Sequence, residues 1–203
     1  VMNTDNMAIS GETIDYGPCA FMDIFSMGRV FSSIDSHGIY KYGSQAHAAH
    51  WNLTKLADSL LPLLHKNMDE ALSLAGVAID EYASEFDSAW ISGMRCKLGL
   101  FGEEEEDFQL VQSLLKWMET SKVDFTETFR DLAYDNLRKN EIYKSLVFEK
   151  WYLLLQAILS RYSKPIKSAL SMMRKYNPVI VPYNHLVEEA LVAAEMGNMQ
   201  PFY

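Results

Sequence analysis

The chain has 203 residues, with 27 acidic and 18 basic side chains and a formal net charge of -9 at pH 7. This length is enough for one domain, or two small ones, with a hydrophobic core, and the acidic balance disfavours nucleic-acid binding through a basic surface. Hydrophobic residues make up 49% of the chain, too many for a disordered protein, and no apolar run approaches the roughly 20 residues of a membrane-spanning helix. We therefore expect a globular protein that binds neither nucleic acid nor membranes.

Residues 1–43 contain short apolar segments separated by turn formers, and five of the ten glycines lie there. Met7–Ile9 and Thr13–Ile14, on either side of a turn at Ser10–Glu12, predict a small β-hairpin. The first residue is Val1 rather than Met, which predicts a processed or truncated chain. We expect residues 1–43 to form a hairpin region at the N-terminal end of a helical lobe.

From Trp51 onward, apolar residues recur three or four positions apart, which is the spacing of one face of a helix. Four such sets are Leu53, Leu56, Leu60 and Leu64; Leu72, Ala75, Ile79, Ala83 and Phe86; Phe108, Val111, Leu115 and Met118; and Phe148, Trp151, Leu155 and Ile158. We expect a helical body over residues 51–203 with about seven helices. The four tryptophans, Trp51, Trp90, Trp117 and Trp151, are predicted to pack between helices.

Several helix ends are also indicated by local residue patterns. Asp124 and Glu127 have the spacing of a capping box, which satisfies free amides in the first turn of a helix. Pro165 can begin a helix without losing a hydrogen bond. Asn177 precedes a proline and is expected to end a helix, and Asn184 is a candidate cap for the last one.

Charge is distributed unevenly. Residues 138–175 contain nine basic side chains and two acidic ones. Such a segment is compatible with a surface that docks an acidic partner. The favoured interpretation is a solvated helical surface that balances acidic neighbours.

The residues that indicate a catalytic or metal-binding function lie in the N-terminal region. Asn6 precedes the predicted hairpin, and Asp15, followed by an aromatic residue and glycine, comes after it. Kinase-like enzymes hold magnesium with an Asn and an Asp in this arrangement, because Mg²⁺ prefers oxygen ligands from amides, carboxylates, phosphates and water. The segment Asn3–Asn6 is also typical of an ordinary turn.

A kinase has its catalytic Asp five residues before the metal-binding Asn, and here that position is Val1. Valine cannot accept a proton, so an ordinary kinase catalytic loop is not present. Asp5 directly precedes Asn6, and its carboxylate is a candidate general base for an attacking hydroxyl.

These segments resemble the selenoprotein O family of pseudokinase-fold enzymes. The resemblance starts with Val1–Met7 and Thr13–Pro18 and extends along the chain to Tyr42–Gln45, His50–Leu53, Leu60–Leu63, Lys97–Leu100 and Asn177–Glu188. Two positions depart from the family pattern: Ala46 stands where proline is usual, and Tyr183 where arginine is usual.

The resemblance implies a mainly α fold, the C-terminal lobe of a protein-kinase-like enzyme, over residues 1–203. It also implies that AMP is transferred from ATP, bound in an orientation flipped relative to kinases, to Ser, Thr or Tyr hydroxyls of proteins. Asp5 would be the proton acceptor, Asn6 and Asp15 the ligands of Mg²⁺, with Mn²⁺ as an alternative, and Asp15 would also contact ATP. The expected location is the bacterial cytoplasm, or the mitochondrion in a eukaryote.

The family's N-terminal lobe, with its glycine-rich loop and phosphate-binding side chains, has no counterpart in these 203 residues. We therefore expect the isolated chain to be inactive. Two alternatives stay open: a helical protein-interaction module without catalysis, and a kinase-like phosphotransferase.

Overall fold

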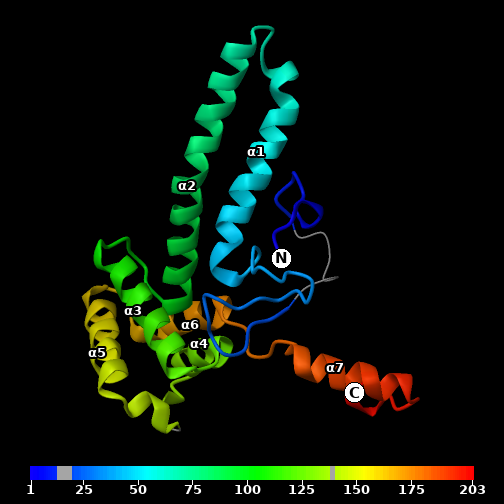
Figure 1. Ribbon diagram of the computed structural model, residues 1–203. Helices are drawn as coiled ribbons and strands as arrows, with labels where there is room; N and C mark the ends of the chain where they lie inside the picture. The colour runs from blue at the N-terminus through cyan, green and yellow to red at the C-terminus, as the bar shows by residue number, and fades with distance from the viewer. Residues whose placement is uncertain (13–19, 138–139) are drawn as a thin grey trace. The chain divides into compact units, whose positions relative to one another are not determined.

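The computed structural model describes residues 1–12, 20–137 and 140–203, and this part of the chain is mainly helical (Figure 1). Its seven α-helices are α1 (Gln45–Leu64), α2 (Met68–Leu98), α3 (Glu106–Ser121), α4 (Phe125–Ala133), α5 (Leu146–Arg161), α6 (Ile166–Tyr176) and α7 (Asn184–Glu195). Four short 3-10 helices accompany them: η1 (Thr4–Asn6), η2 (Tyr42–Ser44), η4 (Glu141–Lys144) and η5 (Gln200–Phe202). The expectation of a mainly α fold with about seven helices is confirmed.

The predicted β-hairpin is not confirmed, because the described residues contain no β-strand. Residues 8–11 instead form a turn, in which the Gly11 amide donates to the Ala8 carbonyl at 3.0 Å and Gly11 adopts a φ of 71°. The second predicted strand, Thr13–Ile14, lies outside the described residues. Segments of two or three residues offer few ladder hydrogen bonds, and an isolated hairpin is marginal even when it is longer.

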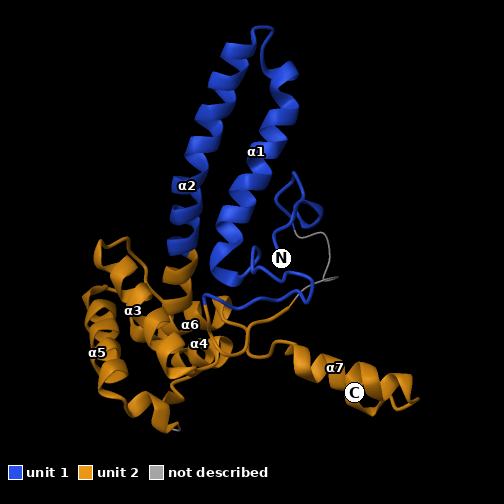
Figure 2. Cartoon of the chain, viewed as in Figure 1, with its two compact units in different colours: residues 1–19, 27–92 blue, residues 20–26, 93–203 orange. Residues whose placement is uncertain are grey.

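Contacts divide the chain into two compact units (Figure 2). The first comprises residues 1–19 and 27–92, and the second comprises residues 20–26 and 93–203. Among the helices that the structure describes, none has both the length and the apolar character needed to cross a membrane.

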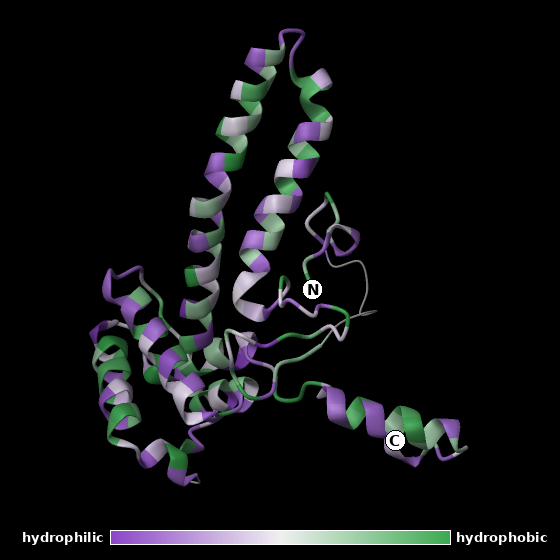
Figure 3. Ribbon diagram, in the orientation of Figure 1, coloured by the Kyte–Doolittle hydropathy of each residue, from purple (hydrophilic) through white to green (hydrophobic). Residues whose placement is uncertain are grey.

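In the first unit, α1 and the greater part of α2 are joined by a short turn. The Asn67 side chain caps the start of α2, where its Oδ1 accepts from the Asp69 amide at 2.8 Å. Tyr82 of α2 donates its hydroxyl to the Ala46 carbonyl of α1 at 3.2 Å. Apolar residues nevertheless recur along the exposed surfaces of both helices (Figure 3), with Leu63 81% exposed.

The hydrophobic core of the second unit lies between α3, α4, α5 and α6. Trp151 of α5 donates its indole N–H to the Leu110 carbonyl of α3 at 2.8 Å, and Trp117 of α3 donates to Ser145 Oγ at 3.1 Å. The rings of Trp117 and Phe148 lie 4.6 Å apart between their centroids. The expected packing of Trp117 and Trp151 is confirmed.

The same expectation is wrong for Trp51, which is 55% exposed. Helical periodicity indicates which residues share a face, and it does not indicate whether another element covers that face. Phe108 is likewise exposed, whereas its neighbours Leu110 and Val111 are fully buried.

The segment before residue 27 contributes to the second unit through backbone pairing. The Phe25 amide donates to the Val123 carbonyl at 2.9 Å, and the Phe125 amide donates to the Asp23 carbonyl at 2.8 Å. These bonds hold an extended segment against the start of α4 and bury Phe25 almost completely.

Candidate functional site

Asp5 and Asn6, the candidate base and one candidate metal ligand, lie together in the single turn η1. Asn3 caps this turn, since its side-chain oxygen accepts from the Asn6 amide at 3.2 Å. The Asn6 side chain donates from Nδ2 to the Val1 carbonyl at 2.8 Å. Both Asp5 and Asn6 are exposed, so the loop presents a carboxylate and an amide oxygen at neighbouring positions on the surface of its unit.

Gln45, the first residue of α1, is one of two side chains that attach this loop to the helix. Its Oε1 accepts from the Met2 amide at 2.8 Å. Its Nε2 donates to the carbonyls of Tyr40 and Lys41, the second at 3.2 Å. Gln45 therefore connects the N-terminal loop, the segment before α1 and the start of the helix.

Asn52, two turns further along α1, is the second attachment. It is buried, with 7% of its surface exposed, and its Nδ2 donates to the Met2 carbonyl at 2.9 Å and contacts Met7 Sδ. Met2 is thus held at both its amide and its carbonyl by α1, and Met7 is held on the other side of η1.

The three attached groups bracket Asp5 and Asn6 on both sides. A loop held only by its own turn would sample many conformations, so anchoring at Met2 and Met7 reduces the entropy lost when the two oxygen donors adopt one geometry. Sequence reasoning did not assign this role to Gln45 or Asn52. The available signal was that both lie in segments that resemble the selenoprotein O family.

Asp15, the other candidate metal ligand and the candidate ATP contact, falls outside the described residues. The structure therefore gives no distance between Asp15 and Asn6. The donors that are described, the Asp5 carboxylate and the Asn6 amide oxygen, are the hard oxygen ligands that Mg²⁺ prefers. Within residues 1–12, 20–137 and 140–203, no group of three or more His, Cys, Asp or Glu side chains is arranged to hold a metal ion.

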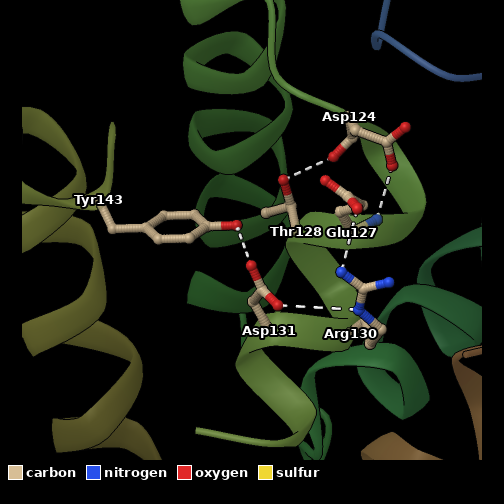
Figure 4. Close-up of polar contacts among 6 residues, drawn as sticks. All are labelled: Asp124, Glu127, Thr128, Arg130, Asp131 and Tyr143. Carbon is tan, nitrogen blue, oxygen red and sulfur yellow. Dashed lines mark hydrogen bonds and ion pairs between the residues drawn. The ribbon is translucent and has the colours of Figure 1, made fainter. Parts of the chain in front are cut away.

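A second polar cluster surrounds the start of α4 (Figure 4). Asp124 Oδ1 accepts from the Glu127 amide at 2.6 Å, and Thr128 donates its hydroxyl to the Asp124 carbonyl at 2.7 Å. The predicted cap at Asp124 is confirmed. The Glu127 side chain does not complete a capping box, because it accepts from Arg130 at 3.1 Å instead.

Burial and hydrogen bonding perturb the titration of this cluster. Burial raises the pKa of the Asp124 carboxyl, against the opposing effect of the hydrogen bonds from the Glu127 amide and Tyr183. Burial, with the nearby Asp131 carboxylate, raises the pKa of Tyr143, which donates its hydroxyl to Asp131 at 3.0 Å (Figure 4). The cluster links α4 to η4 and to Tyr183. These contacts join neighbouring segments, and we therefore interpret the cluster as structural.

Basic side chains of residues 138–175 make contacts within their own unit. Arg161 pairs with Glu106 at 3.1 Å, and Lys144 pairs with Glu141 at 2.5 Å. Arg174 donates to the Ala133 carbonyl at 3.1 Å and lies over the ring of Tyr134. Arg138 and Lys139 lie outside the described residues. These contacts favour the interpretation of the segment as a helical surface balanced by acidic neighbours.

Comparison with known proteins identifies the family. The whole chain, residues 1–203, matches the family described as "Protein adenylyltransferase SelO". The chain is 50% identical over 194 residues, 96% of its length, to a protein of Bacillus cereus named "Protein nucleotidyltransferase YdiU". It is 49% identical over the same length to a protein of that name from Bacillus thuringiensis subsp. konkukian.

These residues correspond to 40% of the length of each Bacillus protein, so the chain spans about two fifths of the curated relatives that it matches. The match to the family, over residues 1–203, covers the anchored loop of residues 1–7 as well as every helix that the structure describes. The chain belongs to the SelO family of protein adenylyltransferases.

Proposed function

We propose that these 203 residues are the C-terminal lobe of a kinase-like protein adenylyltransferase and supply its proton acceptor and its metal ligands. In the reaction, AMP passes from ATP to a Ser, Thr or Tyr hydroxyl of a protein. The observation that carries the proposal is the attachment of the Asp5–Asn6 turn to α1 through Gln45 and Asn52, in a chain that belongs to the family over all of its residues.

The proposed role of Asp5 is to take the proton of the attacking hydroxyl. As that proton moves to the carboxylate, the hydroxyl oxygen forms a bond to the α-phosphorus of ATP. The bond from this phosphorus to the oxygen that bridges it to the β-phosphate breaks, and pyrophosphate leaves with the electron pair. An exposed carboxylate held on an anchored turn can meet a protein substrate without a large rearrangement of its own backbone.

The proposed role of Asn6 and Asp15 is to hold Mg²⁺, with Mn²⁺ as an alternative, and Asp15 would also lie near ATP. A bound divalent cation would neutralise charge on the phosphates. The amide oxygen of Asn6 is suited to this role because Asn6 uses its Nδ2, not its oxygen, to bond to Val1. Because the chain spans two fifths of its relatives, we assign the phosphate-binding side chains to the rest of the longer protein and expect the isolated chain to be inactive.

The test is adenylyl transfer by the full-length protein, measured with labelled ATP, a general protein substrate and mass spectrometry of the product. We expect Asp15→Ala to abolish transfer and Asp5→Asn to lower kcat by about 10²–10⁴-fold, the usual contribution of general acid–base catalysis. Asn6→Ala should raise the concentration of Mg²⁺ needed for half-maximal rate.

Glu12→Gln is the matched control, since it removes an exposed acid from the same region without touching a proposed ligand. Transfer at the normal rate by Asp15→Ala would contradict the metal site. Mass spectrometry separates the two transferase chemistries, because a phosphoryl group on the target would instead indicate a kinase-like phosphotransferase. Full-length protein that shows neither product would favour a protein-interaction module.

A further inference from the structure

A cavity of about 360 Å³ lies within the second unit, where α6 packs against both α4 and α5. Protein interiors are close-packed and contain few voids larger than a water molecule, and an engineered cavity of about 150 Å³ is already enough to hold benzene. The volume lies within the range of small-molecule sites, about 300–1,000 Å³. None of the residues proposed for adenylyl transfer lines the cavity, so it is a candidate for a separate binding site.

The inner wall of this cavity is apolar. Leu155 of α5 and Met173 of α6 line it and are almost completely buried, with 1% and 2% of their surfaces exposed. Leu132 of α4 and Leu159 of α5 also line it and are buried. Water on such a wall finds no hydrogen-bond partner, whereas a hydrocarbon group that covers it is itself removed from water. The wall therefore favours a ligand with an apolar body.

Two polar side chains line the same cavity and mark its mouth. Asp135, just after α4, and Gln156, on α5, are both exposed to solvent. In the described part of the chain, neither side chain forms a hydrogen bond or an ion pair. A ligand that enters from solvent therefore meets a carboxylate and an amide group before it reaches the apolar wall.

The backbone that carries the Asp135 carboxylate is held by a turn at the end of α4. Asp135 has a φ of 54°, in the left-handed region that aspartate and asparagine adopt more readily than most residues. The amide of the next residue, Asn136, donates to the Asp131 carbonyl at 2.9 Å and closes the turn. A carboxylate on a closed turn loses less entropy on binding than one on an open loop.

Three features of the lining favour a positive charge on the ligand. The first is the Asp135 carboxylate itself. The second is the C-terminal end of α4, which carries a partial negative charge and whose last turn places Leu132 in the lining. The third is the aromatic ring of Tyr152, which also lines the cavity, since the faces of such rings attract cations.

One basic side chain already contacts the end of α4. Arg174 donates to the Ala133 carbonyl at 3.1 Å and lies over the ring of Tyr134, and neither of these two residues lines the cavity. Arg174 forms no ion pair with Asp135. Among the described residues, the carboxylate at the mouth of the cavity is therefore without a counter-ion.

We propose that this cavity binds a small organic amine. The hydrocarbon body of the amine lies against the apolar wall, and its ammonium group donates at the mouth to the Asp135 carboxylate and to the side-chain oxygen of Gln156. An organic acid would place a second negative charge beside Asp135, and a metal cation would leave the apolar wall uncovered. The proposal is independent of the Asp5 loop.

The experiment titrates the folded full-length protein near pH 7 with hexylamine, hexanol and hexanoate and measures binding by calorimetry. The three probes share one hydrocarbon chain and differ in charge, because an alkyl amine is protonated at this pH and a carboxylic acid is ionised. We expect hexylamine to bind with a Kd of about 1 mM. Hexanol should bind about tenfold more weakly, and hexanoate more weakly than hexanol.

Two variants locate the charge and the apolar contact. Asp135→Asn keeps the size of the side chain and a residue type that accepts a positive φ, so it should weaken hexylamine about tenfold and leave hexanol unchanged. Leu170→Phe places a larger side chain in the lining and should remove binding of both probes. Glu149→Gln, a change at an exposed acid of α5 that does not line the cavity, is the control and should bind as wild type does.

Thermal unfolding without ligand shows whether Leu170→Phe is folded, and Ile166→Trp, at a half-exposed position of the same lining, replaces it if it is not. The proposal is overturned if hexylamine does not bind, or if it binds no better than hexanol. It is equally overturned if Asp135→Asn binds hexylamine as wild type does, or if a folded cavity-filling variant retains the binding.

Discussion

Asn52 of α1 donates a hydrogen bond from Nδ2 to the carbonyl oxygen of Met2, 2.9 Å away and fifty positions earlier in the sequence. This bond, together with that from the Met2 amide to Gln45, holds the turn that carries Asp5 and Asn6. The geometry of the candidate site therefore depends on two polar side chains of a helix that contribute no proposed ligand.

Replacing Asn52 by leucine should lower the free energy of unfolding by about 1–2 kcal/mol, because the half-buried Met2 carbonyl loses its donor. The loop would also be released, so adenylyl transfer by the full-length protein should fall even though every proposed ligand is present. Thermal unfolding and transfer assays measure the two effects. Ser59→Ala, an exposed change on the same helix, is the control, and equal behaviour of the two variants would contradict an anchoring role for Asn52.

Gly99 should not tolerate a side chain. It ends α2 with a φ of 73°, and a Cβ placed there would lie 2.9 Å from the Ala169 carbonyl oxygen of α6. Gly99→Ala should therefore cost about 2–4 kcal/mol, from the left-handed backbone and the close contact together. Urea denaturation gives the measurement.

Gly93→Ala is the matched control for this prediction, since Gly93 lies inside α2 and a methyl group added there would meet no atom within 4 Å. It should stabilise the protein by about 0.5–1 kcal/mol through helix propensity. Losses of similar size at both glycines would mean that the approach of α6 to Gly99 is not the cause.

Arg95 is expected to be essential for stability. Its Nε donates to Asp107 Oδ2 at 2.6 Å, and the Asp107 side chain has no exposed surface. Arg95→Met leaves a buried carboxylate without its counter-ion, which typically costs about 3–5 kcal/mol. Arg161→Met removes an ion pair whose two side chains are about half exposed, and it should cost less than about 1 kcal/mol. Equal losses of stability in Arg95→Met and Arg161→Met, measured by chemical denaturation, would contradict this difference between the buried and the exposed ion pair.

The stability of the protein should depend on pH through Lys97. Its folded pKa is about 8, below the ordinary 10.5, so between these values the unfolded chain binds more protons and stability rises with pH. Below pH 8 both states are protonated, and the full cost of burying the charge is present. The rise should amount to roughly 2–3 kcal/mol by pH 10.5.

Lys97→Met isolates this effect, because the difference between wild type and variant should show the rise and the variant alone should not. Burial raises the pKa of Tyr143 and of Tyr183, so the folded state holds those protons longer and stability should decline above pH 10 in both proteins. A wild-type curve that runs parallel to that of Lys97→Met from pH 8 to 10 would argue against the shifted amine.

Much of the helical structure could be predicted because its signals are local. The spacing of Phe148, Trp151 and Leu155 identified α5, and all three are buried. Asp124 was recognised as a cap because its partner amide lies three residues away. The hairpin is not confirmed in the described residues, and segments of two or three apolar residues specify a strand only when a neighbouring segment pairs with them.

The helical faces, the helix ends at Asp124 and Asn177 and the family could be predicted from spacing and from motifs along the chain, whereas Asn184, a candidate cap, is the first residue of α7 and Tyr183 precedes it. The folded structure was needed to show that Gln45 and Asn52 hold Met2, that Arg95 pairs with Asp107, and that Lys97 lies over two phenylalanine rings. The physical reason is the same in each case. A hydrogen bond, an ion pair or a desolvated amine depends on distances of a few ångströms between groups 12 to 50 positions apart, and periodicity carries no information on those distances.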